Sequence, residues 1–287
     1  MNYLFFILVF FIGKVCASER SQGISATFID RENQKGIIEV AKLYAKEGTF
    51  IHEDWGVASK SHENQSNPGF DFVFILKEIN EEKLKDILRR METFYGKRYF
   101  ELWIDNKNNS SQRSLEALGY EKLADFPGRA TILDKNFHNI SEDGVSIKHV
   151  TDIATAKDWA LVTAKVHNLN EQNLTKFCES AMGKSGVSFY VGYYQGLPVS
   201  TRMMIVYEKT VTGYFSATLP EFRRKGIASS VLRFSLNEMR KNGINLYVNQ
   251  AVSGGSILWK KIGMREYGNI YSCYRKSISS LLLGVIQ

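Results

Sequence analysis

Amphipathic segments with helical spacing alternate with short apolar runs along this chain, and the pattern predicts alternating helices and strands. The clearest helix is expected to begin near Gly226, because apolar residues follow at three- and four-residue steps through Leu232, Leu236 and Met239. Asn242-Gly243 should end this helix, since a residue that adopts the left-handed conformation readily stops a helix.

In the first half, the pattern predicts helices, strands and one long polar loop. A strand at residues 24–29 should lead into a helix at 31–47 that Asp30 caps, and the polar segment 51–69 should form a surface loop. A second helix should open at Asn80 and stop at Gly96. The other expected elements are strands at 70–76 and 99–105, a short helix at 114–119, and strand-like segments at 120–124 and 130–133.

In the second half, the pattern predicts a strand, two helices and three successive strands before the helix at Gly226. Two turn segments are legible: Gln195-Gly196-Leu197-Pro198 joins two strands, and Ser253-Gly254-Gly255 precedes a short helix. The expected elements are strands at 145–150, 187–194, 199–207, 210–218, 244–249, 264–267 and 271–275, and helices at 153–166, 171–182 and 256–262.

Composition adds an expectation about domain number and partners. The 287 residues exceed the usual size of one domain, so two domains are expected. The net charge of +7 permits an anionic partner, but no Lys/Arg run exceeds three residues, so we expect no nucleic acid. The three cysteines and five histidines are scattered, which excludes a disulfide framework and gives a metal site no support.

The N-terminus resembles a signal peptide. Residues 1–12 are almost wholly apolar, and Val15 and Ala17 are small residues at the positions that select a cleavage site. The apolar run is shorter than the roughly 20 residues of a membrane span, and no Lys or Arg precedes it. Export or membrane attachment through residues 1–17 therefore stands against a misassigned start or a buried N-terminal strand.

A cationic turn precedes the helix at Gly226. Pro220 disfavours continued strand pairing, and Arg223, Arg224 and Lys225 follow it directly. A helix N-terminus presents unpaired N–H groups and a partial positive charge, so anions bind there. The turn and the helix start together predict a phosphate site.

Two motifs resemble those of the GNAT (GCN5-related N-acetyltransferase) superfamily. The stretch Arg223-Arg224-Lys225-Gly226-Ile227-Ala228 fits the family's [QR]-x-x-G-x-[GA] turn. Residues 251–264 are similar to its A-x-x-x-G-x-x-L-Y-x-x-x-G-F motif, and both occur in the family's order of elements. The resemblance covers residues 145–276 and implies an acyl-CoA site in the second half.

The first half resembles a degenerate copy of the same fold. Its strand, helix, strand and S-L-E-A-L-G-Y segment repeat the later order, but Glu81 and Glu82 occupy the start of its helix, where acids would repel a diphosphate. We therefore expect a mixed α/β fold of tandem GNAT-like domains, each with a mainly antiparallel mixed sheet flanked by helices. The expected divisions are a signal-like segment at 1–17, a degenerate domain at 18–138, a catalytic domain at 139–278 and a tail at 279–287.

The resemblance also assigns roles to residues of the second half. Backbone N–H groups of the turn would hold the CoA pyrophosphate, pantetheine would lie along the strand that ends at Thr218, and an N–H of Ala217 or Thr218 would polarise the thioester. The residues implied to bind the cofactor are Phe215, Ala217, Thr218, Arg223, Arg224, Lys225, Gly226, Ile227, Ala228, Gly255 and Trp259.

The sequence departs from the family pattern at the catalytic acid. Trp259 occupies the position where many relatives have a tyrosine that protonates the departing thiolate, and an indole cannot do so at neutral pH. Tyr247 or Tyr271 could substitute for it. The candidate bases are Glu208, Tyr214 and Asn249 with a water molecule, whereas His167 is expected on a helix surface or in the cleft.

These expectations lead to one leading function and one alternative. The leading function is an N-acyltransferase, with acetyl-CoA as co-substrate and an amine of a small molecule or peptide as acceptor. The alternative is a non-catalytic CoA-binding or interaction module, possibly exported. CoA dependence favours the cytoplasm, whereas residues 1–17 favour export or membrane contact.

Overall fold

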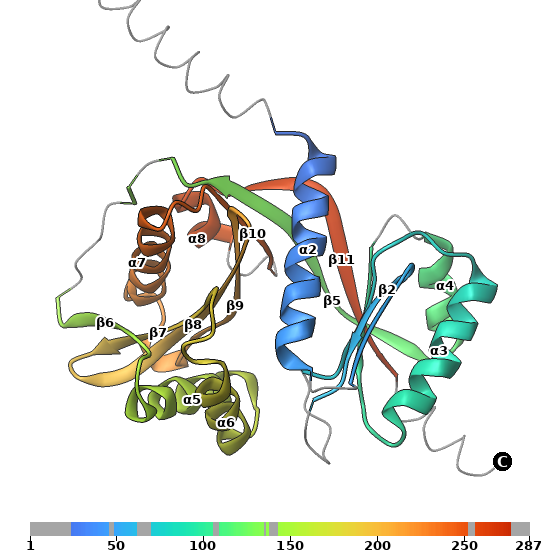
Figure 1. Cartoon of the computed structure of the whole chain (residues 1–287), viewed down its shortest axis with the longest axis horizontal. Helices are drawn as coiled ribbons and strands as arrows, with labels where there is room; N and C mark the ends of the chain where they lie inside the picture. The colour runs from blue at the N-terminus through green and yellow to red at the C-terminus, as the bar shows by residue number, and fades with distance from the viewer. Residues whose placement is uncertain are drawn as a thin grey trace, which may run out of the picture.

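The computed structural model describes residues 24–45, 49–61, 70–105, 109–134, 136–137, 143–251 and 256–276. The described residues form a mixed sheet of eleven strands that helices flank (Figure 1), which confirms the mixed α/β class. The signal-like segment 1–17 and the tail 279–287 lie outside these residues. None of the helices in the described part is long and apolar enough to span a membrane.

The described residues of the first half form three helices and five strands. In chain order they are α2 (Ala26–Tyr44), β1 (Phe50–Glu53), β2 (Gly56–Ser59), β3 (Phe72–Ile75), α3 (Glu81–Tyr95), β4 (Glu101–Asp105), α4 (Asn109–Ala117) and β5 (Tyr120–Ile132). Helix α3 begins and ends where the sequence predicts. The Asn80 side chain accepts a hydrogen bond from the Lys83 N–H at 2.8 Å, and Gly96 ends the helix with φ +63°.

In the second half, the described residues form four α-helices, one 3-10 turn and six strands. They are β6 (Val145–His149), α5 (Ile153–His167), α6 (Glu171–Ala181), β7 (Val187–Tyr194), β8 (Leu197–Tyr207), β9 (Thr210–Thr218), η1 (Pro220–Phe222), α7 (Ile227–Lys241), β10 (Leu246–Gln250), α8 (Ser256–Lys261) and β11 (Arg265–Lys276). Residues that alternate along β7 and β8 pack on α5 and α6 on one face of the sheet and on α7 on the other.

The two halves repeat each other and exchange their last strands. The strand order is β1-β2-β3-β4-β11-β5-β10-β9-β8-β7-β6. The parallel pair β3–β4 of the first half corresponds to the parallel pair β9–β10 of the second. However, β11 pairs with β4, and β5 pairs with β10, both antiparallel. The two exchanged strands pair with each other at the centre, so the sheet runs continuously through both halves.

The predicted strand at residues 24–29 is wrong. Ser25 is the N-cap of α2, and its side chain accepts a hydrogen bond from the Phe28 N–H at 3.1 Å. Buried Ile29 and Ile37 lie on the same side of this helix, so the apolar residue assigned to a strand belongs to a helical stripe. Asp30 is therefore inside the helix and is not its cap.

Two further predictions need correction. The proposed loop at 51–69 contains strand β2 and most of strand β1, which form an antiparallel hairpin, while residues 62–69 lie outside the described part. The paired segments predicted at 120–124 and 130–133 are one strand, β5, and those at 264–267 and 271–275 are one strand, β11. A register shift between Glu266 and Ile270 interrupts the β5–β11 ladder, and this break explains why the sequence pattern divided β11.

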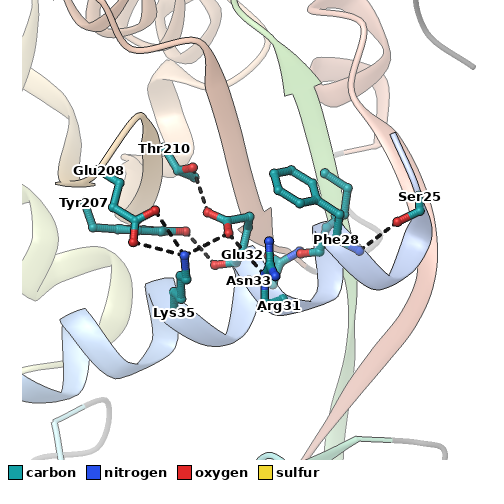
Figure 2. A network of polar contacts seen from close by, with 10 residues as sticks. Ser25, Phe28, Arg31, Glu32, Asn33, Lys35, Tyr207, Glu208 and Thr210 are labelled. Atoms are coloured by element: carbon teal, nitrogen blue, oxygen red, sulfur yellow. Dashed lines mark hydrogen bonds and ion pairs between the residues drawn. The ribbon is translucent and has the colours of Figure 1, made fainter. Parts of the chain in front are cut away.

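Helix α2 connects the two halves, because it packs across strands of both (Figure 1). Buried Glu32 accepts a hydrogen bond from the Thr210 hydroxyl at 2.9 Å, and its backbone carbonyl accepts one from the Tyr207 hydroxyl at 2.5 Å. Lys35 lies 3.2 Å from the Glu32 carboxylate and 3.1 Å from that of Glu208 (Figure 2). These contacts hold the β8–β9 hairpin against a helix of the first half.

Candidate acyl-CoA site

A pocket opens where two parallel strands separate. Strand β9 pairs with β10 only from Thr210, opposite Leu246, to Thr212, opposite Val248. Beyond Thr212, β9 continues to Thr218 with no partner on that edge in the described residues. A cavity of about 1030 Å³ lies here, lined by residues of β8, β9, α7 and α8 and of the turn that follows β9.

The turn after β9 delivers the chain into α7 through two left-handed residues. Arg224 has φ +65°, and Gly226, the N-cap of α7, has φ +75°. No side chain caps the helix, so its first N–H groups have no side-chain acceptor among the described residues. Both residues line the cavity, which places a helix N-terminus with unsatisfied donors at the pocket wall.

The cations of the turn have different surroundings. The Arg223 guanidinium donates to the Thr218 carbonyl at 3.0 Å, which ties the turn to the end of β9. The Lys225 ammonium lies 5.1 Å from the ring centre of Tyr194 and also contacts Phe222. Arg224, Lys225 and Gly226 line a second cavity of about 440 Å³, and Arg224 and Gly226 line both cavities.

A residue from α8 adds to this cationic region. Lys261 lines both cavities beside the turn. Arg224, Lys225 and Lys261 therefore face the second cavity together with one acid, Asp143. Three cations beside a helix N-terminus form a strongly positive site, which is suited to several phosphate groups.

The start of α7 lies close to the sheet because strand β7 has a glycine beneath it. A Cβ atom at Gly192 would lie 2.5 Å from Val231 Cγ2 and 3.4 Å from Ile227 Cγ2. Ile227 is the first residue of α7 and is 1% exposed. The close contact between β7 and α7 thus sets the distance between the N-terminus of α7 and the sheet.

Strand β9 contains a bulge at the pocket. Thr201 pairs with Ala217 but Met203 pairs with Tyr214, and Phe215 has φ +48°. After the bulge, the Leu219 N–H donates to the Val199 carbonyl on β8 at 3.0 Å. N–H directions alternate along a strand, so the Thr218 N–H faces the open edge.

The same alternation turns the Ala217 N–H toward β8. Its carbonyl also faces β8, where it accepts a hydrogen bond from the Ser200 hydroxyl at 2.8 Å. Of the two backbone donors that the sequence suggested, the geometry therefore favours Thr218 over Ala217. Both residues line the pocket.

Trp259 and Arg202 lie together in the wall of the pocket. Trp259 is 7% exposed, and its indole N–H has no acceptor among the described residues. The Arg202 guanidinium lies 5.9 Å from the Trp259 ring centre and 5.3 Å from that of Tyr247. Gly255, the other cofactor residue implied on this segment, lies outside the described part of the chain.

The two tyrosines suggested as acids are both buried. Tyr247 is fully buried and accepts hydrogen bonds from Arg202 and, at 2.9 Å, from Asn249; burial raises its pKa, which Arg202 opposes. Tyr271 donates to Asp30 at 2.8 Å, and burial holds its pKa well above the ordinary value. Neither lines the pocket, so the geometry gives no support to Tyr271 as the acid, and Tyr247 contacts the pocket wall only through Arg202.

The suggested bases are also misplaced. Glu208 lies in the β8–β9 turn with Lys35, at the opposite end of β9 from Thr218. Burial raises the pKa of Tyr214, which makes this phenol a poor base. Asn249 is buried and bonded to Tyr247, as described above. The geometry therefore gives no support to Glu208 as a base, because this residue pairs with Lys35 of α2 and does not line the pocket.

His167 is better placed than any of these residues. It is the last residue of α5, and its ring lies 6.0 Å from that of Phe215 at the bulge. Its helix neighbour Val166 lines the pocket. The side chain is exposed at the helix end, yet desolvation by neighbouring atoms lowers the pKa of His167 below 6.5, so the imidazole is neutral at pH 7.

The corresponding turn in the first half lacks these features. Asn80 caps α3 with its own side chain, so a donor that is open in α7 is occupied there. Glu81 and Glu82 stand in the first turn, and Glu81 pairs with Lys85 at 2.6 Å. An anion at this helix start would meet two carboxylates. No group of three or more metal-ligating side chains occurs among the described residues of either half.

Solved structures resemble this arrangement. A GCN5-related N-acetyltransferase from Kribbella flavida aligns with a TM-score of 0.64 over 84% of this chain and 95% of its own, at 11% identity. The chain has the GNAT fold. An N-acetyltransferase of the same class from Sphaerobacter thermophilus aligns at 0.59 over 79% of this chain and 75% of its own, at 13% identity.

A third neighbour and the sequence comparisons complete this picture. A functionally unknown conserved protein from Staphylococcus epidermidis aligns at 0.57 over 73% of this chain and 86% of its own, at 15% identity. No protein-family model matches the sequence, and no curated protein matches it significantly. The likeness to these three structures is therefore one of fold, at sequence identities of 11 to 15%.

The sequence did not single out three residues that the structure places in or beside the pocket. Arg202 gave no signal, because a lone arginine in an apolar strand belongs to no motif. Lys261 was visible in the α8 motif without a role, and His167 was set aside because nothing nearby in the sequence pairs with it. Arg202 and Lys261 line the pocket, whereas His167 lies next to it on α5, where its ring contacts Phe215.

Proposed function

We propose that this protein is an acyl-CoA-dependent N-acyltransferase, with acetyl-CoA as its first candidate co-substrate. The observation that carries the proposal is that the open edge of β9 and the cationic start of α7 line one pocket. A thioester with a long polar arm and a phosphate tail needs both features. The proposal goes beyond the fold, which is compatible with many functions.

The turn would hold the phosphate end of the co-substrate. N–H groups at the start of α7 would bind the pyrophosphate, and Arg224 and Lys261 would add charge from two sides. Pantetheine would follow the unpaired edge of β9 and accept hydrogen bonds as a neighbouring strand would. This arrangement would bring the thioester to the bulge at Phe215.

In the proposed reaction, a neutral amine attacks the thioester carbonyl. The new C–N bond forms a tetrahedral oxyanion that the Thr218 N–H would stabilise, a contact for which losing the donor costs about 2.7 to 4 kcal/mol in other enzymes. The C–S bond then breaks and CoA leaves as the thiolate. His167 would take the amine proton, directly or through water, because its lowered pKa keeps it unprotonated at neutral pH.

The leaving thiolate would depart without an acid beside it. Trp259 occupies the wall where an acid would be useful, and an indole N–H does not ionise in this pH range. A thiol with an ordinary pKa of about 8.5 is a tolerable leaving group as the anion. The reaction therefore remains possible, at a rate limited by thiolate departure.

The same feature supports a second candidate, a CoA-binding module without turnover. Trp259 in the wall and Tyr247 buried behind Arg202 leave the pocket without a proton donor of suitable pKa among the described residues. A domain that only senses CoA would need the phosphate turn and nothing else.

Release of free thiol from acetyl-CoA with a panel of amines separates the two candidates. The transferase predicts amine-dependent release, which His167→Ala should lower by about 100-fold, as for a lost general base. His149→Ala is the matched control, since His149 stacks on Tyr190 at 5.2 Å, away from the pocket. Tight acetyl-CoA binding with no release for any amine would support the sensing module instead.

A further inference from the structure

The pocket contains a buried positive charge that no acid of the described chain neutralises. Arg202 lies on β8 opposite the β9 bulge and is 2% exposed, yet it lines the pocket. Its Nε donates to the Met204 sulfur at 3.1 Å, Nη1 donates to the Ser216 hydroxyl at 2.7 Å, and Nη2 donates to the Tyr247 hydroxyl. None of these partners carries a negative charge.

Two other arginines with little exposure, Arg129 and Arg98, each lie beside a carboxylate. Arg129, also 2% exposed, pairs with the Glu266 carboxylate at 2.6 Å. Arg98, whose side chain is 11% exposed, lies 3.3 Å from the carboxylate of Asp71. Arg202 has no carboxylate oxygen within 4.0 Å among the described residues. A buried charge without a partner is costly, so a guanidinium held at a pocket wall in this way indicates an anionic ligand.

The remaining donors of Arg202 suit a carboxylate. A guanidinium has five N–H groups, and the three bonds above leave one on each terminal nitrogen. The aromatic rings of Tyr247 and Trp259 and the Ser216 hydroxyl hold the planar group in one orientation. A fixed planar fork binds the two oxygens of a carboxylate better than it binds a single polar atom.

The position of Arg202 separates this site from the phosphate site. The phosphates are expected at the start of α7, where Arg224 and Lys261 lie. Arg202 instead contacts Ser216 on β9 and Tyr247 on β10, near the point where these strands separate. Resting on the function proposed above, this is the end of the pocket where the acyl group would lie.

We propose that Arg202 binds a carboxylate carried by one of the two reactants. The carboxylate belongs either to a dicarboxylic acyl group, as in succinyl-CoA, or to an amine acceptor of the amino-acid type. Arg202 would then determine which substrate binds, because only a ligand whose carboxylate reaches the Arg202 guanidinium neutralises its charge.

The first arm of the test compares succinyl-CoA with acetyl-CoA in calorimetric titrations of the wild type, Arg202→Met and Arg202→Lys. If the acyl group carries the carboxylate, the wild type prefers succinyl-CoA by about tenfold or more, Arg202→Met loses this preference and Arg202→Lys keeps part of it. The ratio of two affinities within one preparation does not depend on the folded fraction. Arg31→Met, which removes an exposed cation of α2, is the control that keeps the wild-type ratio.

The second arm measures thiol release from acetyl-CoA with amino acids and their decarboxylated amines. If the acceptor carries the carboxylate, the wild type prefers the amino acids and Arg202→Met does not. A wild type that binds CoA but shows no carboxylate preference in either arm overturns this inference alone. Slower release by Arg202→Met, by one factor for all ligands, also overturns it and assigns Arg202 to the thiolate. A wild type that does not bind CoA removes this inference and the proposed function together.

Discussion

The contact between β7 and α7 can be tested by adding a single methyl group. In Gly192→Ala, the new Cβ would lie 2.5 Å from Val231 Cγ2, so the two must separate by roughly 0.9 Å to reach ordinary contact. Val231 is β-branched and stiff in a helix, so the helix moves rather than the side chain. Gly192 is not among the residues with positive φ, and alanine therefore adds no backbone strain.

The displacement should lower both stability and CoA affinity. Overpacking of this kind costs about 1–3 kcal/mol of the free energy of unfolding. A similar shift of the α7 N-terminus weakens an N–H bond to a phosphate, which is worth about 1.5–3 kcal/mol, or a factor of about 10 to 100 in CoA affinity. Urea unfolding and calorimetric CoA titration measure the two effects.

A double mutant provides the control for this prediction. Val231→Ala removes the clashing methyl group and should by itself cost about 2 kcal/mol of stability. In Gly192→Ala/Val231→Ala, the loss should be smaller than the sum of the single losses, and CoA affinity should recover part of the way. Wild-type stability and affinity in Gly192→Ala, or strictly additive losses in the double mutant, would refute the reasoning.

Two other predictions concern the first half. The hydrogen bond from Arg90, with a smaller contribution from Trp55, lowers the pKa of Glu53 from 4.5 to about 2. The stabilisation of the fold by the Glu53–Arg90 pair is therefore complete above pH 4.5 and is lost as the pH falls toward 2. Because Glu53 is about a third exposed, urea unfolding should show Glu53→Gln less stable than wild type by at most about 1 kcal/mol at pH 7, with a smaller difference at pH 3. Ser25→Ala should lower the free energy of unfolding by about 1 kcal/mol, whereas Ser25→Asp should not, and equal stability of all three would contradict the cap.

Local signals in the sequence were sufficient for much of the fold. Asn80 and Gly96 bound α3 as predicted, because a cap and a left-handed stop act on their own helix. Ser25 and Asp30 can each cap the N-terminus of a helix, and the short apolar run between them is compatible with a strand as well as with a helix. Only the packing of Ile29 in the core selects the earlier cap.

Long-range pairing could not be predicted in this way. The exchange of β5 and β11 depends on pairing between strands that lie more than 100 residues apart in the chain. The residue pattern of either strand does not indicate which strand it pairs with. At the candidate site, the cationic turn before α7 was predictable because its charges and its glycine are adjacent in sequence. Arg202 and His167 were not, because each takes its position from the packing of a different element, β8 for Arg202 and α5 for His167.

We propose that the second half of the chain, and not the first, binds the phosphate end of CoA. Calorimetric titration of CoA into the wild type, Arg224→Glu and Lys77→Glu tests it most directly, since Lys77 holds the matching place between β3 and α3. We expect one CoA site per chain, with CoA affinity lowered about tenfold or more in Arg224→Glu and unchanged in Lys77→Glu. No binding by the wild type, two equal sites, or equal losses in both variants would contradict it.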